Sequence, residues 1–319
     1  MDGLALGIDT SNYTTSIAVA DAAGDVVYEA GILLQVKPGE RGLRQSEALY
    51  QHVKNLPALF EKLPEHLRLR ERLQVVCYSD RPRPLEDSYM PVFRAGIGCG
   101  KTIGSLFGVP TLAVSHQENH IRSAIYGSGA KPEALRFPLL ATHFSGGTSE
   151  ILLVDTKKSG YDCKIVGATL DLNAGQLIDR VGVRLGYAFP AGRALEQLAR
   201  EAVAHDCVIP SRVEKTDFHF SGQENKAAAL LDAGVPPAEV AYGLHRCIAK
   251  TLSKAIARAA AVYGAQDVLF SGGVMSNQII RALIEKELDR KRLRLHFTQP
   301  CYATDNAAGN ALLGIETMT

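Results

Sequence analysis

The 319-residue sequence lacks several features that mark special classes of protein. No apolar run approaches the roughly 20 residues that a membrane-spanning helix needs, so we expect no membrane protein of that type. The N-terminus carries Asp2 and no basic segment, and it therefore does not resemble a signal peptide. The formal net charge is only +1, so any nucleic-acid contact would need a local basic face.

The six cysteines also lack any CxxC spacing. They are Cys77, Cys99, Cys163, Cys207, Cys247 and Cys301. In a chain of this length, such scattered cysteines are typical of reduced, mostly buried thiols in a cytoplasmic protein. This pattern favours neither a disulfide framework nor a structural zinc site built from cysteines.

Two segments share one pattern, in which a hydrophobic strand, a short turn rich in Gly, Ser and Thr, and a second strand follow each other. The first covers residues 4–19 and the second covers residues 139–154. A short polar hairpin exposes backbone N–H groups and hydroxyls that can bind a phosphate. The pair suggests a duplicated lobe with a ligand held between the copies, although two unrelated hairpins are the alternative.

A third segment strengthens the idea of a nucleotide-binding protein. The buried strand 267–270 leads into Ser271-Gly272-Gly273 and then into an amphipathic helix over 278–288. A glycine turn at a helix N-terminus lets backbone approach an anionic ligand and adds the positive end of the helix dipole. Together, the three segments predict an α/β protein of the actin/hexokinase/heat-shock-70 (ASKHA) type, with two RNase H-like lobes and an active site in the cleft between them.

The order of predicted elements gives provisional lobe boundaries. Strands alternating with helices indicate a mixed α/β sheet in each lobe. We expect a first lobe from residues 1–134 plus about 301–319, because the last helix packs back on it, and a second lobe from residues 135–300. In the second lobe we expect helices over 176–185, 191–204, 229–233 and 240–263, with a loop around 217–223.

His116 and His120 stand four residues apart directly after the predicted strand 111–114. If residues 116–126 are helical, both imidazoles lie on one face and can bind one divalent ion. Asp305, at the head of the terminal helix, is the candidate third ligand. The alternative is a solvated helix face with two ordinary histidines. Glu118 points away from both, so this is not the HExxH order of a zinc peptidase.

The segment Gly98–Thr102 resembles the end of a phosphate-binding Walker A loop. That motif needs glycine at position 95, where this chain has Ala95, and no strand precedes it. We therefore predict a helix whose small residues allow close packing.

The combined motifs resemble the TsaD/Gcp family over nearly the whole chain. The matching residues are Leu6-Gly7-Ile8-Asp9-Thr10-Ser11, His116-x-x-x-His120, Ser145-Gly146-Gly147, Asp217-Phe218-x-Phe220-Ser221-Gly222, Ser271-Gly272-Gly273-Val274-x-x-Asn277 and Thr304-Asp305-Asn306. This family contains the tRNA N6-adenosine threonylcarbamoyltransferases.

The resemblance implies a role for each matching residue. His116, His120 and Asp305 would hold a divalent metal, iron or zinc, and Asp9 and Ser11 would belong to the catalytic centre. An adenine nucleotide, either threonylcarbamoyl-AMP or ATP, would be bound by a second group of residues. This group is His143, Phe144, Ser145, Gly146, Gly147, Asp179, Gly192, Gly272, Gly273 and Asn277.

The implied reaction moves a threonylcarbamoyl or carbamoyl group from the adenylated donor to N6 of adenosine 37 in tRNA. The family also implies a homologous partner subunit and a small ATPase. Two other functions stay open, namely a non-catalytic nucleotide-binding scaffold in a tRNA-modification complex and, less favoured, a metallopeptidase.

The chain departs from the family pattern around the substrate. An adjacent acidic pair is replaced by Tyr13 and Thr14, and a Gly-Pro-Gly turn is replaced by a segment with Arg81 and Arg83. Ala191 and Arg193 likewise replace residues of a Pro-Gly-Gly-Pro motif. These changes indicate a divergent paralogue whose acyl donor or acceptor can differ.

Overall fold

The computed structural model describes residues 3–11, 13–36, 43–85 and 87–318. The chain divides into two compact units. Unit 1 comprises residues 1–129, 156–163 and 301–319, and unit 2 comprises residues 130–155 and 164–300. The expected lobes differ from these units in two places. Residues 130–134, expected in the first lobe, belong to unit 2, and the tip of one hairpin, Thr156–Cys163, belongs to unit 1.

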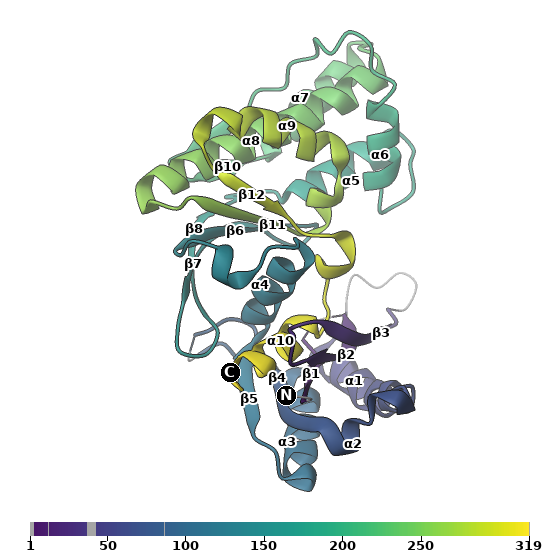
Figure 1. Ribbon diagram of the computed structural model, residues 1–319. Coiled ribbons are helices and arrows are strands. Elements are labelled where there is room, and N and C mark those ends of the chain that lie inside the picture. The colour runs from purple at the N-terminus through teal and green to yellow at the C-terminus, as the bar shows by residue number, and fades with distance from the viewer. Residues whose placement is uncertain (1–2, 12, 37–42, 86, 319) are drawn as a thin grey trace. The chain divides into compact units, whose positions relative to one another are not determined.

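Unit 1 is built on a five-stranded sheet with the order β3-β2-β1-β4-β5 (Figure 1). The hairpin β1–β2 and its neighbour β3 are antiparallel, whereas β1, β4 and β5 are parallel. The strands are β1 (Leu4–Asp9), β2 (Thr14–Asp21), β3 (Val26–Leu33), β4 (Leu73–Arg81) and β5 (Thr111–Ser115). The first predicted hairpin is thus confirmed.

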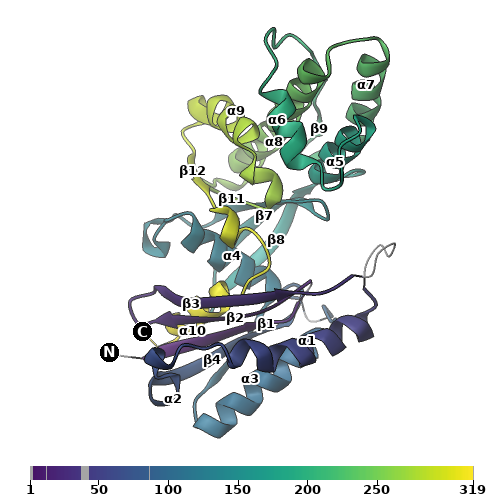
Figure 2. The same cartoon turned by 90° about the vertical axis from the view of Figure 1, so that its right-hand side faces the viewer.

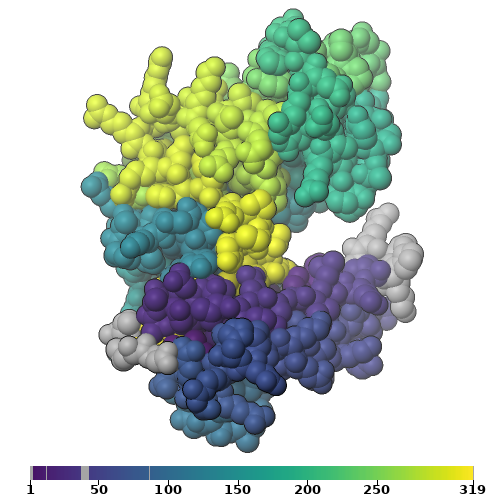
Figure 3. Space-filling view, turned by 45° about the vertical axis from the view of Figure 1, so that its right-hand side comes forward, coloured from purple at the N-terminus to yellow at the C-terminus, as the bar shows by residue number. Residues whose placement is uncertain are grey.

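Helices cover both faces of this sheet, which is why every residue of β1 is buried. Alternate residues such as Leu6 and Ile8 pack against α1 (Gln45–Phe60) and α3 (Phe93–Phe107), which Figure 2 shows on one side of the sheet. Ala5 and its neighbours on the other face pack against α10 (Ala308–Glu316). The short helices η1 (Glu65–Leu67) and α2 (Leu69–Arg72) follow α1, and residues of this region form part of the surface in Figure 3.

The segment Gly98–Thr102 lies inside α3, as predicted for a packing helix. A Cβ atom at Gly100 would come within 2.4 Å of the Tyr78 ring, and one at Gly104 would come within 2.4 Å of the Thr111 methyl group. The glycines therefore allow α3 to approach the sheet closely, and this stretch is not a phosphate-binding loop.

Unit 2 repeats the topology of unit 1. Its sheet has the order β12-β11-β6-β7-β8, so β6, β7, β8, β11 and β12 correspond to β1, β2, β3, β4 and β5. The strands are β6 (Leu139–Phe144), β7 (Ser149–Thr156), β8 (Tyr161–Ala168), β11 (Asp267–Ser271) and β12 (Arg294–Phe297). The repeated order supports the predicted duplication.

The core of unit 2 is completed mainly by its helices, which pack on the sheet. The further elements of this unit are η2 (Pro132–Ala134), α5 (Ala174–Arg184), α6 (Gly192–Ala199), β9 (Arg212–Glu214), β10 (Asp217–His219), α7 (Ser221–Asp232), α8 (Pro237–Tyr263), η3 (Gly273–Ser276), α9 (Gln278–Leu288) and η4 (Asp289–Lys291). The short helix η5 (Pro300–Tyr302) lies where the chain passes from unit 2 to unit 1. No helix of the described residues is long and apolar enough to cross a membrane.

Three predicted segments of unit 2 were wrong in extent, and one of them is the helix predicted over 229–233, which instead covers Ser221–Asp232 as α7. The helix predicted to reach Ala204 ends at Ala199, because the Glu239 carboxylate binds the N–H groups of residues 203–205 in a turn. The predicted loop 217–223 contains β10 and the start of α7, where Asp171 accepts hydrogen bonds from the N–H groups of Phe220 and Ser221. At the end of α6 and at the start of α7, a carboxylate distant in sequence decides the boundary.

A candidate metal centre in unit 1

The two histidines lie in the first turns of α4 (His116–Gly127), which follows β5 without a loop. Ser115 is the N-cap, and its hydroxyl accepts a hydrogen bond from the Glu118 N–H at 3.2 Å. The Glu118 carboxylate accepts the Ser115 N–H at 2.8 Å, which completes a capping box. The helix predicted over 116–126 is confirmed, and its cap fixes the start of the helix at His116.

Asp305 lies beside both imidazoles. Its Oδ1 atom is 3.2 Å from His120 Nε2 and 3.5 Å from His116 Nε2. The ring centroids of the two histidines are 4.2 Å apart, and one ligand atom from each of the three residues lies within 4.8 Å of the others. The structure thus brings together three side chains that the sequence separates by up to 189 positions (305 minus 116).

Hydrogen bonds hold the Asp305 segment against α4. The Asn119 amide donates to the Asn306 carbonyl at 2.6 Å, and the Ser123 hydroxyl donates to Asn306 Oδ1 at 2.9 Å. Gly309 is needed beside this contact, because a Cβ atom there would lie 2.0 Å from the Asn119 carbonyl oxygen. Asn119 and Ser123 were not among the predicted site residues, although their positions three and seven residues after His116 were a signal for a shared helix face.

Asp9 and Ser11 lie on the other side of His116. Asp9, at the end of β1, places Oδ1 3.4 Å from His116 Nδ1, and it accepts the Ser11 hydroxyl through Oδ2 at 2.5 Å. Both residues are buried. Asp9 therefore lies beside the nitrogen of His116 that faces away from Asp305, and Ser11 contacts Asp9, which is the arrangement of an outer carboxylate that orients a metal-binding imidazole.

The charges of this cluster favour a bound cation. Burial alone would lower the pKa of His116, but the carboxylates of Asp9 and Asp305 outweigh it and raise this pKa to about 10. Burial alone would raise the pKa of Asp305, but His116 and His120 outweigh it and hold this pKa well below the ordinary value. Two carboxylates around two imidazoles thus require positive charge, which protons or a divalent ion can supply.

The donor set fits a divalent transition metal. Zinc binds imidazole nitrogen and carboxylate oxygen at about 2.0–2.2 Å, so neighbouring donors on one ion lie about 3 Å apart. The separations of 3.2 and 3.5 Å from Asp305 to the two histidines match this requirement. Two histidines and one carboxylate are also the facial ligand set of non-haem iron enzymes.

Backbone turns of unit 2

The turn after β6 is closed by its own hydrogen bonds. The Ser145 hydroxyl accepts from the N–H groups of Gly147 and Thr148, and the Ser145 N–H donates to the Thr148 carbonyl at 2.7 Å. A Cβ atom at Gly146 or Gly147 would meet nothing within 4 Å. The turn therefore presents bare backbone to its surroundings.

Two further glycines pack directly against this turn. Gly272 has φ +95°, and a Cβ atom there would lie 2.3 Å from the Phe144 carbonyl oxygen. A Cβ atom at Gly175, near the start of α5, would lie 2.6 Å from the Gly146 nitrogen. The predicted glycine turns at 145–147 and 272–273 therefore lie next to each other in the structure. Gly273 itself is not packed against a neighbour, because a Cβ atom there would have no other atom within 4 Å.

Three other predicted nucleotide-binding residues, Asp179, Asn277 and His143, make hydrogen bonds or strand pairs within unit 2. Asp179 accepts the Ala191 N–H at 2.8 Å and so helps to start α6 beside Gly192. Asn277 caps α9 by accepting the Ile280 N–H at 3.0 Å. His143 lies near the end of β6, paired with Ser271 of β11 and Glu150 of β7. Asp179 also lines a pocket of about 510 Å³ with Gln176, Arg180, Val183, Arg184, Phe189 and Glu224.

The residues that distinguish the chain from the family pattern differ in exposure, since Ala191 is buried and Thr14, Arg81 and Arg83 are half-buried. Tyr13 is 43% exposed and Arg193 is exposed. Arg81 lies 3.2 Å from the neighbouring Asp80 carboxylate. All six cysteines are free, and three of them, Cys77, Cys207 and Cys247, are buried. The metal-ligand cluster of the described residues contains none of the six.

Comparisons with known proteins agree with this architecture. The family model described as "TsaD: tRNA N6-adenosine threonylcarbamoyltransferase" matches residues 33–312. The chain is 32% identical to a tRNA N6-adenosine threonylcarbamoyltransferase of Thermus thermophilus over 310 residues, with 96% of this chain and 90% of that protein covered. The corresponding protein of Archaeoglobus fulgidus is 26% identical over 313 residues, with 98% and 90% covered.

Solved structures show the same fold at low sequence identity. The structure of the HypF protein of T. kodakarensis is similar to this chain, with a TM-score of 0.60 at 16% sequence identity. The match covers 99% of this chain and 48% of HypF. The component A of (R)-2-hydroxyglutaryl-CoA dehydratase of Acidaminococcus fermentans covers 99% of this chain with 98% of its own, at 16% identity and a TM-score of 0.56. The fold is therefore of the ASKHA type, as predicted, and the chain belongs to the TsaD family of tRNA N6-adenosine threonylcarbamoyltransferases.

Proposed function

We propose that this protein is a metal-dependent transferase. It moves a threonylcarbamoyl, or carbamoyl, group from an adenylated donor to N6 of adenosine 37 in tRNA. The observation that carries this proposal is the convergence of His116, His120 and Asp305 in a chain of this family. A non-catalytic scaffold protein has no need of three buried or half-buried side chains whose ligand atoms lie close enough to bind one metal ion.

The metal site supplies the chemical part of the proposal. His116, His120 and Asp305 would hold iron or zinc, which would supply Lewis-acid polarisation of the carbonyl oxygen of the acyl group. Asp9 keeps the His116 ring oriented through Nδ1, and Ser11 holds the Asp9 carboxylate in place. The amine N6 attacks the carbonyl carbon, the bond from this carbon to the phosphate oxygen breaks, AMP leaves with the electron pair, and the amine proton passes to solvent.

The backbone turns of unit 2 supply the nucleotide-binding part. Gly146, Gly147 and Gly273 leave open backbone where an anionic phosphate can approach without meeting a side chain. Asn277 caps α9 directly after the Gly272-Gly273 turn, so the positive end of this helix lies in the same region. We assign the adenylate of the donor to these turns.

The peptidase alternative lacks the base that it needs. A zinc peptidase of the HExxH type uses a glutamate next to its metal-binding histidines. Glu118 instead binds Ser115 and the Lys157 ammonium group. The structure offers Glu118 no role as a base at this centre.

A transfer assay tests the proposed function. The purified protein, loaded with zinc or iron, is mixed with threonylcarbamoyl-AMP and unmodified tRNA, with and without the homologous partner subunit and small ATPase that we propose as partners. The nucleosides are then analysed by mass spectrometry. We expect Asp305→Ala to lose its metal and to reduce transfer by about 100-fold or more, since Lewis-acid polarisation is worth several kcal/mol.

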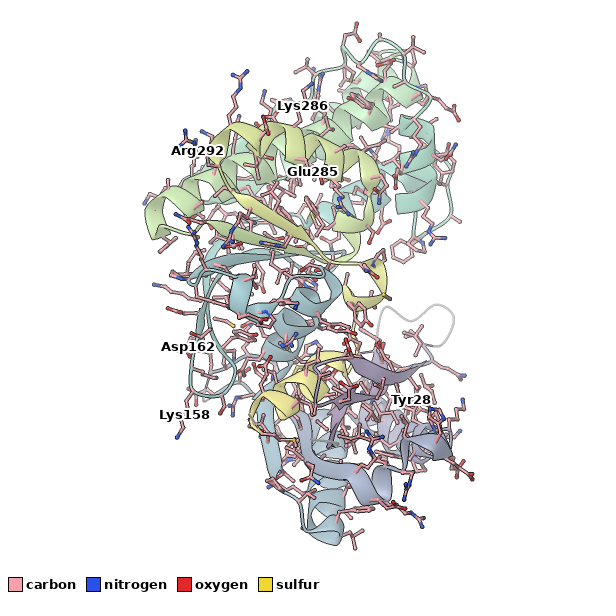
Figure 4. The ribbon with its side chains drawn as sticks, viewed as in Figure 1. Tyr28, Lys158, Asp162, Glu285, Lys286 and Arg292 are labelled. Atoms are coloured by element: carbon pink, nitrogen blue, oxygen red, sulfur yellow. The ribbon has the colours of Figure 1, made fainter. Side chains whose placement is uncertain are left out.

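A matched control separates loss of the site from loss of a charge. Asp162 is an exposed carboxylate of β8 in the same unit (Figure 4), and Asp162→Ala should retain both metal and transfer. Metal binding without transfer under every condition would contradict the proposal and favour the scaffold. Absence of metal from the wild-type protein would contradict it directly.

A further inference from the structure

Glu118 is a buried carboxylate on the side of α4 away from the two histidines. Its side chain is only 1% exposed, yet it binds no metal ligand. Its Oε2 atom accepts both the N–H and the hydroxyl of Ser115, at 2.8 and 2.7 Å. These two hydrogen bonds define the first turn of the helix, in which His116 is the first residue.

The other oxygen of Glu118 is held by the hairpin tip between β7 and β8. Oε1 lies 2.7 Å from the Lys157 ammonium nitrogen, and it accepts the Tyr161 N–H at 3.2 Å. Gly160, with φ +97°, makes this approach possible, because a Cβ atom there would lie 2.4 Å from the same oxygen. The tip Thr156–Cys163 is also the part of the hairpin that belongs to unit 1.

The ion pair compensates a charge that would otherwise be costly. The Glu118 carboxylate is buried, and its contacts with the Lys157 ammonium group and with Ser115 are what its negative charge binds there. A buried carboxylate that loses its cation is destabilised and moves toward water. Such a movement weakens its hydrogen bonds to Ser115.

We propose that Glu118 and Lys157 are positioning residues of the metal centre, acting through the Ser115 cap on the orientation of His116. This inference rests on the proposed metal-dependent function. The hairpin tip thereby supplies an outer support for the centre on one side of His116, while Asp9 supports it from the other. Replacement of outer groups of this kind commonly weakens metal binding by about 10- to 100-fold.

A comparison of neighbouring lysines tests the proposal. Lys157→Met removes the cation at Glu118, whereas Lys158→Met removes an exposed cation at the next position of the same tip (Figure 4). The full-length variants are titrated with Co²⁺, and both the dissociation constant and the visible absorption spectrum of the bound ion are recorded. We expect Lys157→Met to bind about 10-fold more weakly with an altered spectrum, and Lys158→Met to match the wild type.

The conservative variant and a metal-free measurement complete the test. Lys157→Arg should bind Co²⁺ with a dissociation constant within about 3-fold of the wild-type value, because it retains a cation at Glu118. Without metal, Lys157→Met should accelerate amide hydrogen exchange in a peptide covering residues 115–122, and Lys158→Met should not. Equal Co²⁺ binding and equal exchange in the two methionine variants would overturn the inference. If the wild type binds no Co²⁺, Zn²⁺ or Fe²⁺, the proposed function fails, and this role of Glu118 and Lys157 fails with it.

Discussion

The two sheets of this protein share one strand order but carry different kinds of chemical group after their parallel strands. In unit 1, β1 ends at the buried Asp9, and the edge strand β5 leads directly to His116. In unit 2, β6 ends before Ser145-Gly146-Gly147, and β11, which corresponds to β4 of unit 1, leads to Gly272-Gly273. Unit 1 therefore presents side-chain ligands after two of its parallel strands, whereas unit 2 presents bare backbone after two of its own.

This difference shows how one topology serves two tasks. The parallel strands of each sheet bring their carboxyl ends to one edge of that sheet, whatever residues follow them. The residues then decide the chemistry, because imidazoles and carboxylates bind cations while open N–H groups of glycine turns favour anions. Four predictions follow from the contrast, in order of decreasing effect.

The first concerns the tight backbone contact in unit 2. Gly272→Ala places a Cβ atom 2.3 Å from the Phe144 carbonyl oxygen and forces φ +95° on a residue with a side chain. We expect a loss of about 3 kcal/mol or more in the free energy of unfolding. Far-UV circular dichroism during denaturant unfolding measures it. The neighbouring Gly273→Ala, whose Cβ meets nothing, should cost less than about 1 kcal/mol; equal losses would refute the close-contact explanation.

The second concerns the side-chain site in unit 1. Asp9→Asn removes the charged partner of His116 Nδ1, so we expect the metal dissociation constant to rise about 10- to 100-fold. Isothermal titration calorimetry with Zn²⁺ measures the change. Ser11→Ala, which removes one hydrogen bond to Asp9, should have a smaller effect, about 3-fold. Asp25→Asn, an exposed carboxylate between β2 and β3, serves as the control and should leave binding unchanged.

The third asks whether the open turn of unit 2 is kept bare for a ligand. Gly146→Ala meets no neighbouring atom, so its free energy of unfolding should stay within about 0.5 kcal/mol of the wild type. A bound phosphate would meet the new methyl group, and we expect AMP to bind about 5- to 10-fold more weakly, a change of about 1 kcal/mol. Gly222→Ala, also in open space but at the start of α7, should bind AMP normally. Unchanged AMP binding by Gly146→Ala would argue against a nucleotide at this turn.

The fourth concerns the carboxylate that starts α7. Burial alone would raise the pKa of Asp171, but hydrogen bonds from the Ser221 hydroxyl and from the N–H groups of Phe220 and Leu172 hold it well below 3.8. Because this pKa is lower in the folded than in the unfolded protein, Asp171 stabilises the fold above about pH 4, and this stabilisation is lost as the pH falls further.

The corresponding variant should show this pH dependence. Asp171→Asn should lower the free energy of unfolding by about 1 kcal/mol at pH 7, and the difference from the wild type should shrink toward pH 3. Asp232, whose exposed carboxylate pairs with Arg184, provides the control. Asp232→Asn should cost no more than about 0.5 kcal/mol at either pH.

Local patterns were sufficient for much of the fold. The buried runs of β1 and β6, the polar turns after them and the glycine turn before α9 predicted these elements correctly, because burial and turn chemistry act over a few residues. The ends of α6 and α7 were wrong, because Glu239 and Asp171 set them from distant positions. Propensity carries no information about such long-range hydrogen bonds.

The sequence by itself determined the helix that aligns His116 with His120, since a spacing of four residues places two side chains on one face of any α-helix. It also determined the bare turns of unit 2, because glycine has no side chain to cover them. Only the tertiary structure decided that Asp305 meets the histidines, that Asp9 stands behind His116, and that Glu118 binds Lys157. Those contacts depend on how the packed sheet, α4, α10 and the hairpin tip bring distant residues within a few ångströms, which no spacing along the chain can specify.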